Sequence, residues 1–166
     1  ELRGVRLPTT DSPALTVRHL MTMSAGLPED NPWGDRQMAV DNAAFEKLIA
    51  QGLSFSNAPG MGYEYSNLGY ILLGKIVTKV SRMRFQDYIT QNILLPLGMK
   101  DTVWEYAGIG RGRFAQGYRW ERGNWVAEPV LHDGDGAAMG GLITTMDDFA
   151  RYVAFHLDAW PARDGA

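Results

Sequence analysis

Residues 67–81 read NLGYILLGKIVTKVS, and this stretch decides the fold. Its apolar positions cover most of the circumference of a helix with 3.6 residues per turn, which predicts a central helix that other elements surround. These positions are Leu68, Ile71, Leu72, Leu73, Ile76, Val77 and Val80. Gly69 and Gly74 interrupt the stretch at a cost of about 1 kcal/mol each relative to alanine. We therefore expect both glycines to let a neighbouring element approach closely.

Two shorter helices are predicted before this stretch. Thr16 has the side chain of an N-cap residue, and Gly26 is the expected left-handed end of the helix that follows it. A second helix is expected to begin at Asp41 and to end at Gly52. The apolar residues of the first helix are Val17, Leu20 and Met21, and those expected to be buried by the second are Phe45, Leu48 and Ile49.

Two more helices are predicted after it. One runs from Phe85 to Leu94 and stops before Pro96 and Gly98. The last begins after Thr145, which with Asp148 has the spacing of a capping box. Its apolar stripe consists of Met146, Phe149, Val153 and Leu157.

Between these two helices the pattern changes to that of a β-hairpin. One strand is expected through Phe114, Gln116 and Tyr118, a turn at residues 121–124, and a second strand from Trp125 to Val130. No internal repeat or linker divides the chain. The sequence therefore predicts a mainly α protein with a small β-hairpin, in which residues 1–166 form a single segment.

Composition excludes several classes of function. With 45% hydrophobic and 21% charged residues among 166, the chain has the apolar material for a packed core. A net charge of −3 without a basic stripe argues against nucleic acid as a partner, and no apolar stretch approaches the roughly 20 residues of a membrane span. The absence of cysteine excludes disulfides and thiolate chemistry and leaves the localisation open. Because the chain starts at Glu1 without a methionine, we expect it to be a piece of a longer protein.

Residues 58–67, APGMGYEYSN, form a polar loop that ends where the central helix begins. Tyr65-Ser66-Asn67 within it resembles the Tyr-x-Asn motif of the serine β-lactamase and penicillin-binding-protein superfamily. The most similar branch comprises class C β-lactamases, D-alanyl-D-alanine carboxypeptidases and related esterases. Residues 15–27, 95–102 and 140–148 agree with that branch in order and spacing, although Met23 stands where relatives often have histidine.

This resemblance implies a fold, a reaction and two site residues. The chain would be the helical-domain portion of an α/β serine hydrolase that cleaves ester or amide bonds, β-lactam or D-Ala peptide-like, through an acyl-serine intermediate. Tyr65 would be catalytic and share proton transfer with the lysine of Ser-x-x-Lys, because a tyrosine is a weak base unless a cation favours its phenolate. Asn67 would hold that lysine and bind the acyl-side amide of a small-molecule substrate. No cofactor and no metal is implied.

The chain departs from the family pattern in what it lacks. None of its serines is followed three residues later by lysine, so the nucleophile motif is absent from these residues. The late Lys-Thr-Gly or His-x-Gly motif is also absent, because His132-Asp133-Gly134 precedes the glycine loop and has no strand context. We expect the chain to be the middle of a larger enzyme, to be inactive alone and to pack against the remaining segments of the same fold.

Other interpretations compete with these assignments. Tyr65 alone is more often a packing residue, and Asn67 is also suited to be only the N-cap of the central helix. Residues 23–26 resemble half of a Gly-x-Ser-x-Gly elbow, and residues 133–136 resemble part of a calcium loop, but neither has the rest of its motif. The histidines lack metal-ligand spacing. The rival function is a non-catalytic helical scaffold or binding module derived from this fold.

Overall fold

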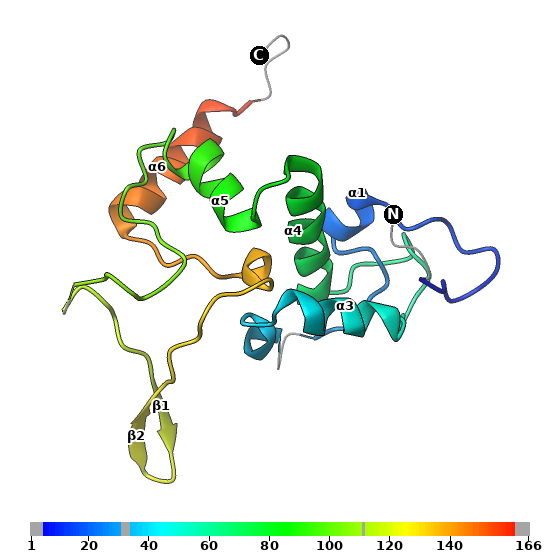
Figure 1. Cartoon of the computed structure of the whole chain (residues 1–166), viewed down its shortest axis with the longest axis horizontal. Helices are drawn as coiled ribbons and strands as arrows, with labels where there is room; N and C mark the ends of the chain where they lie inside the picture. The colour runs from blue at the N-terminus through cyan, green and yellow to red at the C-terminus, as the bar shows by residue number, and fades with distance from the viewer. Residues whose placement is uncertain (1–4, 31–33, 111, 162–166) are drawn as a thin grey trace.

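A computed structural model describes residues 5–30, 34–110 and 112–161 of the chain. Helix α4 lies at the centre and contacts α1, α5 and η3, and a two-stranded hairpin projects from the body (Figure 1). The helices, in order, are α1 (Val17–Met21), η1 (Asp35–Gln37), α3 (Asn42–Ala50), α4 (Asn67–Ser81), α5 (Phe85–Ile89), η2 (Thr90–Leu94), η3 (Ala137–Met139) and α6 (Met146–Asp158). The strands are β1 (Tyr118–Glu121) and β2 (Asn124–Ala127). The predicted mainly α fold with a small hairpin is confirmed.

Helix α4 has the predicted bounds and carries much of the hydrophobic core. The buried core cluster consists of Leu20, Ala25, Leu27, Phe45, Ile71 and Leu72. The prediction of burial is wrong for two residues, Val80 and Leu48. Val80 is 79% exposed in the last turn of α4, and Leu48 is 45% exposed on α3, where Phe45 is the buried residue. Each helix turns only part of its apolar surface toward the described core.

The two glycines of α4 differ in their surroundings. A Cβ atom on Gly74 would lie 2.6 Å from the Cβ atom of Ala138 in η3, so the predicted close approach is confirmed there. A Cβ atom on Gly69 would meet Leu20 and Leu27 only at 3.8 and 3.9 Å, which is ordinary van der Waals contact. The expectation of a close approach at Gly69 is therefore wrong.

Helix starts follow the predicted capping chemistry. The Thr16 hydroxyl accepts a hydrogen bond from the backbone N–H of His19, whose Nδ1 accepts one from the Thr16 N–H, which makes a capping box. At α3, Asp41 Oδ1 accepts from the Ala44 N–H at 2.7 Å. Gly26 has φ of +75° as expected, but α1 already ends at Met21, so this glycine does not end the helix.

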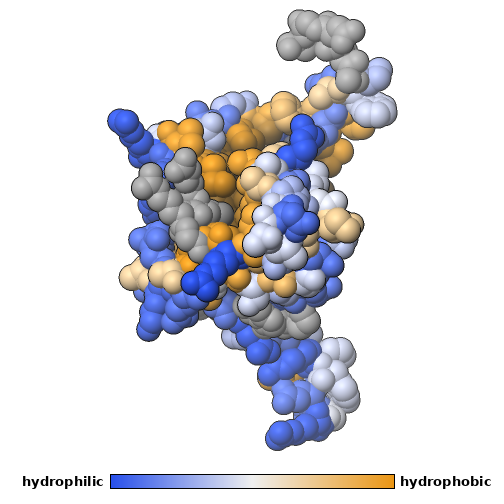
Figure 2. Space-filling model, turned by 90° about the vertical axis from the view of Figure 1, so that its right-hand side faces the viewer, coloured by the Kyte–Doolittle hydropathy of each residue, from blue (hydrophilic) through white to orange (hydrophobic). Residues whose placement is uncertain are grey.

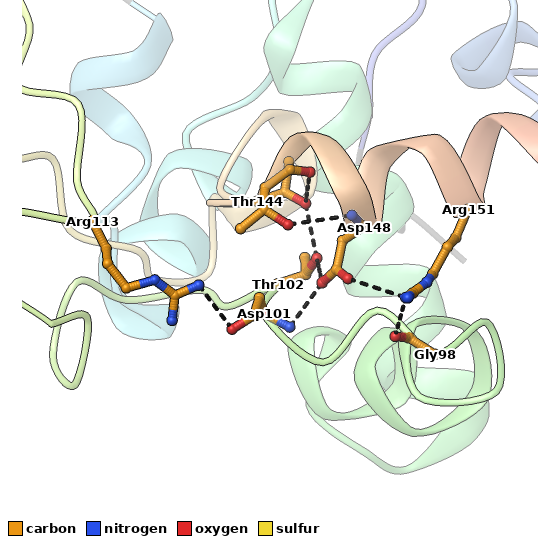
Figure 3. A network of polar contacts seen from close by, with 8 residues as sticks. Gly98, Asp101, Thr102, Arg113, Thr144, Asp148 and Arg151 are labelled. Atoms are coloured by element: carbon orange, nitrogen blue, oxygen red, sulfur yellow. Dashed lines mark hydrogen bonds and ion pairs between the residues drawn. The ribbon is translucent and has the colours of Figure 1, made fainter.

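At α6 only half of the predicted capping box forms. Thr145 Oγ1 accepts a hydrogen bond from the Asp148 N–H, but the Asp148 carboxylate turns away from the cap (Figure 3). It is 3% exposed and accepts hydrogen bonds from the Asp101 N–H at 2.8 Å and the Thr102 hydroxyl at 2.9 Å. Residues 101–102 therefore satisfy this carboxylate, and the hydrogen bonds connect α6 to the loop after η2.

The hairpin turns at the predicted position. Arg122 and Gly123 form its two-residue loop with φ of 50° and 84°, which suits the twist of an antiparallel pair. The strands are shorter than expected. Phe114 lies outside β1 and packs edge-on against Tyr106, while Pro129, which has no N–H group, follows the end of β2.

Much of the apolar surface of α6 faces solvent. Met146 is 81% exposed, Leu157 66%, Phe149 46% and Val153 41%, so the predicted stripe is present and uncovered by the described residues. On the face shown in Figure 2, hydrophobic residues gather in the upper and central part, with hydrophilic residues around them. Among the described helices, none has both the length and the apolar character needed to cross a membrane.

The two glycines of α4 provide a matched test of this packing. We expect Gly74→Ala to lower the free energy of unfolding by about 1–3 kcal/mol, because the new methyl group overlaps Ala138. Gly69→Ala should leave it unchanged or raise it by up to ~1 kcal/mol, since alanine is the better helix former. Urea denaturation of both variants measures the difference. Equal effects would contradict the assigned contact between α4 and η3.

Candidate active site

The Tyr-Ser-Asn motif lies where the loop before α4 turns into the helix. Ser66 is the N-cap, with extended backbone dihedrals, and its Oγ accepts a hydrogen bond from the Gly69 N–H at 3.4 Å. Asn67 is the first residue of the helix, so the interpretation of Asn67 as the N-cap is wrong. The capping geometry fixes the direction in which the chain enters α4.

The structure brings the two predicted site residues together. The Tyr65 hydroxyl donates a hydrogen bond to Asn67 Oδ1 at 3.2 Å. Tyr65 is half-buried, whereas Asn67 is buried with 8% of its surface exposed. A half-buried phenol therefore faces a buried carboxamide.

Asp30 supports this pair from the segment between α1 and η1. Its carboxylate is 5% exposed and accepts hydrogen bonds from the Asn67 N–H at 2.7 Å and the Leu68 N–H at 2.9 Å. The Ser66 hydroxyl also donates to Asp30, at 3.4 Å. The first N–H groups of a helix have no partner within it and favour negative charge, so a carboxylate suits this position. No local pattern connects residues that lie 37 positions apart.

Gly34 is a second neighbour that the sequence interpretation missed. A Cβ atom at this residue would lie 2.0 Å from Asn67 Nδ2 and 2.8 Å from its Cγ. The backbone at Gly34 thus passes directly against the carboxamide of Asn67. Tyr65 lies on the side of the Oδ1 atom, so the amide is held at both ends.

Glu64 ties the loop before Tyr65 to the segment after α1. Its carboxylate accepts hydrogen bonds from the Ser56 hydroxyl at 2.6 Å, the Glu29 N–H at 3.0 Å and the Asn57 side chain at 3.2 Å. The Ser56 hydrogen bond is the main reason why the pKa of Glu64 lies below its ordinary value of 4.5. The loop that presents Tyr65 is therefore braced by hydrogen bonds immediately before the site.

Other candidate motifs take part in ordinary structural contacts. Ser24 follows a helix, and its hydroxyl shares a hydrogen bond with Thr22 at 2.8 Å, which does not fit a nucleophile elbow. His132 lies in a loop, and its Nδ1 is 3.0 Å from Glu105. Lys75 pairs with Asp135. Among the described residues no group of three or more His, Asp or Glu side chains is arranged to hold a metal ion.

Comparison with known proteins finds similarity along almost the whole chain. A family model described as Beta-lactamase matches residues 5–165. The Beta-lactamase-like protein 2 of Dictyostelium discoideum is 32% identical over 150 residues, which is 88% of this chain and 27% of that protein. The octameric penicillin-binding protein homologue from Pyrococcus abyssi has a TM-score of 0.75 and 30% identity, over 95% of this chain and 37% of that one. A class C beta-lactamase has a TM-score of 0.73 and 25% identity, over 96% and 41%.

The chain therefore spans less than half the length of each of these three relatives. The matches nevertheless extend over nearly all of its own residues. The resemblance drawn from the Tyr-x-Asn motif and its flanking stretches is confirmed at the level of the family.

Replacing Glu64 tests the brace before Tyr65 through its pH dependence. A carboxylate whose pKa falls on folding stabilises the native state above its unfolded pKa, and this contribution is lost as the pH falls through the folded pKa. We expect Glu64→Gln to lower the melting temperature at pH 7 and the deficit to shrink below about pH 4.5. Thermal melts across pH 3–7 measure this.

The control is Glu46→Gln, which changes an exposed glutamate on α3. It should give a small effect with little change across the same pH range. A constant deficit for Glu64→Gln at all these pH values would contradict the assigned role of its carboxylate.

Proposed function

Because the chain belongs to the beta-lactamase family, we propose that it is the helical portion of a serine hydrolase that cleaves ester or amide bonds through an acyl-serine intermediate. The observation that carries this proposal is the pairing of the Tyr65 phenol with the Asn67 carboxamide at 3.2 Å, at the buried start of α4. Relatives named as a class C beta-lactamase and a penicillin-binding protein homologue support the same class of reaction.

The proposed role of Tyr65 is proton transfer. Attack of a serine hydroxyl on an acyl carbon requires a base that removes the hydroxyl proton and an acid that returns a proton to the leaving group. Tyr65 is half-buried at the end of a braced loop, so its hydroxyl is both oriented and open to a substrate. A lysine close to the phenol would favour its charged form and make it an effective base.

Asn67 is proposed to orient the substrate and that lysine. Its Oδ1 already accepts the Tyr65 hydroxyl, and an ammonium group beside the two would share the same acceptor. The carboxamide NH₂ group is the donor suited to the carbonyl of an acyl-side amide. One buried amide would thereby connect the proton-transfer group with the substrate.

The nucleophile in this proposal comes from residues beyond this chain, because no Ser-x-x-Lys sequence occurs within it. The same view accounts for the uncovered apolar stripe of α6 as a surface that packs against the remaining segments of the fold. Residues 1–166 then act as one structural unit of the larger enzyme. Its substrates are small molecules with an ester, a β-lactam or a D-Ala peptide-like amide.

Activity assays on the full-length protein test this proposal. We expect Tyr65→Phe to lower kcat on p-nitrophenyl esters or nitrocefin by about 10²–10⁴-fold, the range of general acid–base catalysis, while KM changes little. Tyr63→Phe is the matched control, because Tyr63 is 72% exposed two residues earlier, and it should retain full activity. Equal rates for the two variants would contradict a catalytic Tyr65.

The same assays on residues 1–166 alone should show no turnover above buffer, because the serine and the lysine are both absent. Turnover that survives repurification and is lost in Ser24→Ala would place a nucleophile inside the chain. That result would overturn the proposed division of the site.

The docking role of α6 predicts the behaviour of the isolated chain in solution. In isolation the chain leaves the apolar stripe of α6 exposed, so we expect it to bind a hydrophobic dye or to self-associate. Fluorescence with anilinonaphthalene sulfonate and sedimentation velocity measure the two effects, with the full-length protein as the control. A monomer that is silent to the dye would indicate a self-sufficient domain instead.

A further inference from the structure

We propose that Asp30 and Gly34 are positioning residues for Asn67. Asp30 holds the backbone of Asn67, and Gly34 limits the position of the Asn67 side chain. This inference rests on the proposed function, because it assigns both residues to the same site. Neither residue belongs to the Tyr-x-Asn motif, and neither needs to touch the substrate.

Asp30 fixes the first turn of α4. Its two oxygens accept the N–H groups of Asn67 and Leu68 at 2.7 and 2.9 Å, and the carboxylate is 5% exposed. Ser66 already supplies the usual N-cap bond to Gly69, so α4 has a cap without Asp30. The additional bonds hold the residue that carries the carboxamide, because Asn67 is the first residue of the helix.

Gly34 fixes the direction of the side chain. A Cβ atom there would lie 2.0 Å from Asn67 Nδ2 and 2.8 Å from its Cγ, so an alanine would force the Asn67 side chain to move away. The backbone of Gly34 lies outside the left-handed region, and alanine therefore causes no strain of its own. Displacement of the side chain would break the 3.2 Å hydrogen bond from the Tyr65 hydroxyl to Asn67 Oδ1.

The Asp30 and Gly34 contacts depend on different kinds of interaction. One is a pair of charge-assisted hydrogen bonds to the backbone, and the other is steric contact with the end of the side chain. Both have the same consequence, which is that the carboxamide can occupy one position relative to the Tyr65 hydroxyl. Misplacement by about 1 Å near reacting groups can lower a rate by roughly 10²-fold.

Asp148 is the matched control for Asp30. It is also a buried carboxylate near a helix start, 3% exposed, and it also accepts hydrogen bonds from a backbone N–H and a hydroxyl at 2.8 and 2.9 Å. Its partners are Asp101, Thr102 and the Arg151 guanidinium at 3.7 Å, all of which lie outside the proposed site. Asp148→Asn therefore removes a similar buried charge without moving Asn67.

The experiment uses the full-length protein and two p-nitrophenyl esters. One is the ester of N-acetylalanine, which carries an acyl-side amide, and the other is p-nitrophenyl acetate, which lacks it. We expect Asp30→Asn and Gly34→Ala to lower kcat/KM about 10–100-fold on the first ester and several-fold less on the second. Asp30→Glu should restore part of the loss, and Asp148→Asn should stay within about twofold of wild type on both esters.

The outcomes separate this inference from the proposed function. If Tyr65→Phe is as active as wild type, the proposed function fails whatever the positioning variants do. If Tyr65→Phe is inactive while Asp30→Asn and Gly34→Ala are as active as Asp148→Asn, the positioning roles are overturned and the proposed function stands. If Asp30→Asn does not fold, Gly34→Ala decides alone, because its added methyl group meets Asn67. An equal loss on both esters would also overturn the inference.

Discussion

The buried start of α4 constrains the rest of this structure. A helix begins with N–H groups that have no partner within it, and leaving such groups buried and unbonded costs about 1–3 kcal/mol each. Here the partners come from Ser66 and from Asp30, whose carboxylate accepts two of these groups at 2.7 and 2.9 Å. The segment that carries Asp30 must therefore lie against the helix start, and this contact also brings Gly34 beside Asn67. The geometry of the candidate site follows from the way these N–H groups find hydrogen-bond partners.

The same constraint places Tyr65 beside the start of α4. Tyr65 is the last residue before the cap, so its phenol is carried by a loop but lies next to the first turn of the helix. Glu64, which precedes it, is hydrogen-bonded to Ser56, Asn57 and the backbone of Glu29. A side chain at this junction is both accessible and fixed, which suits a group that transfers protons to a bound substrate. In the beta-lactamase family, to which the chain belongs, this position fits the proposed division of work between the helical portion and the rest of the enzyme.

The sequence predicted the local structure of helix bounds, caps and turns, but it did not predict contacts between distant residues. The bounds of α4, the N-caps Thr16 and Thr145 and the hairpin turn were predicted because each depends on residues within a few positions of one another. The Asp30 contact joins residues 37 positions apart, and the Gly34 contact joins 33, so no periodicity indicates either. Asp148 had the spacing of a capping box, but the Asp101 N–H and the Thr102 hydroxyl compete better for its carboxylate. Tyr65 and Asn67 were found through the family resemblance, whereas the groups that hold them required the fold.

Hydrogen–deuterium exchange at the amides of Asn67 and Leu68 tests the central claim most directly. Wild-type protein should protect both amides nearly as well as those in the middle of α4, because the Asp30 carboxylate accepts both. In Asp30→Asn these two amides should lose protection by about tenfold or more, a shift of roughly 1.4 kcal/mol, while those of Ile71 and Leu72 keep theirs. Unchanged protection at Asn67 and Leu68 in a folded Asp30→Asn variant would contradict the claim that this carboxylate holds the start of α4.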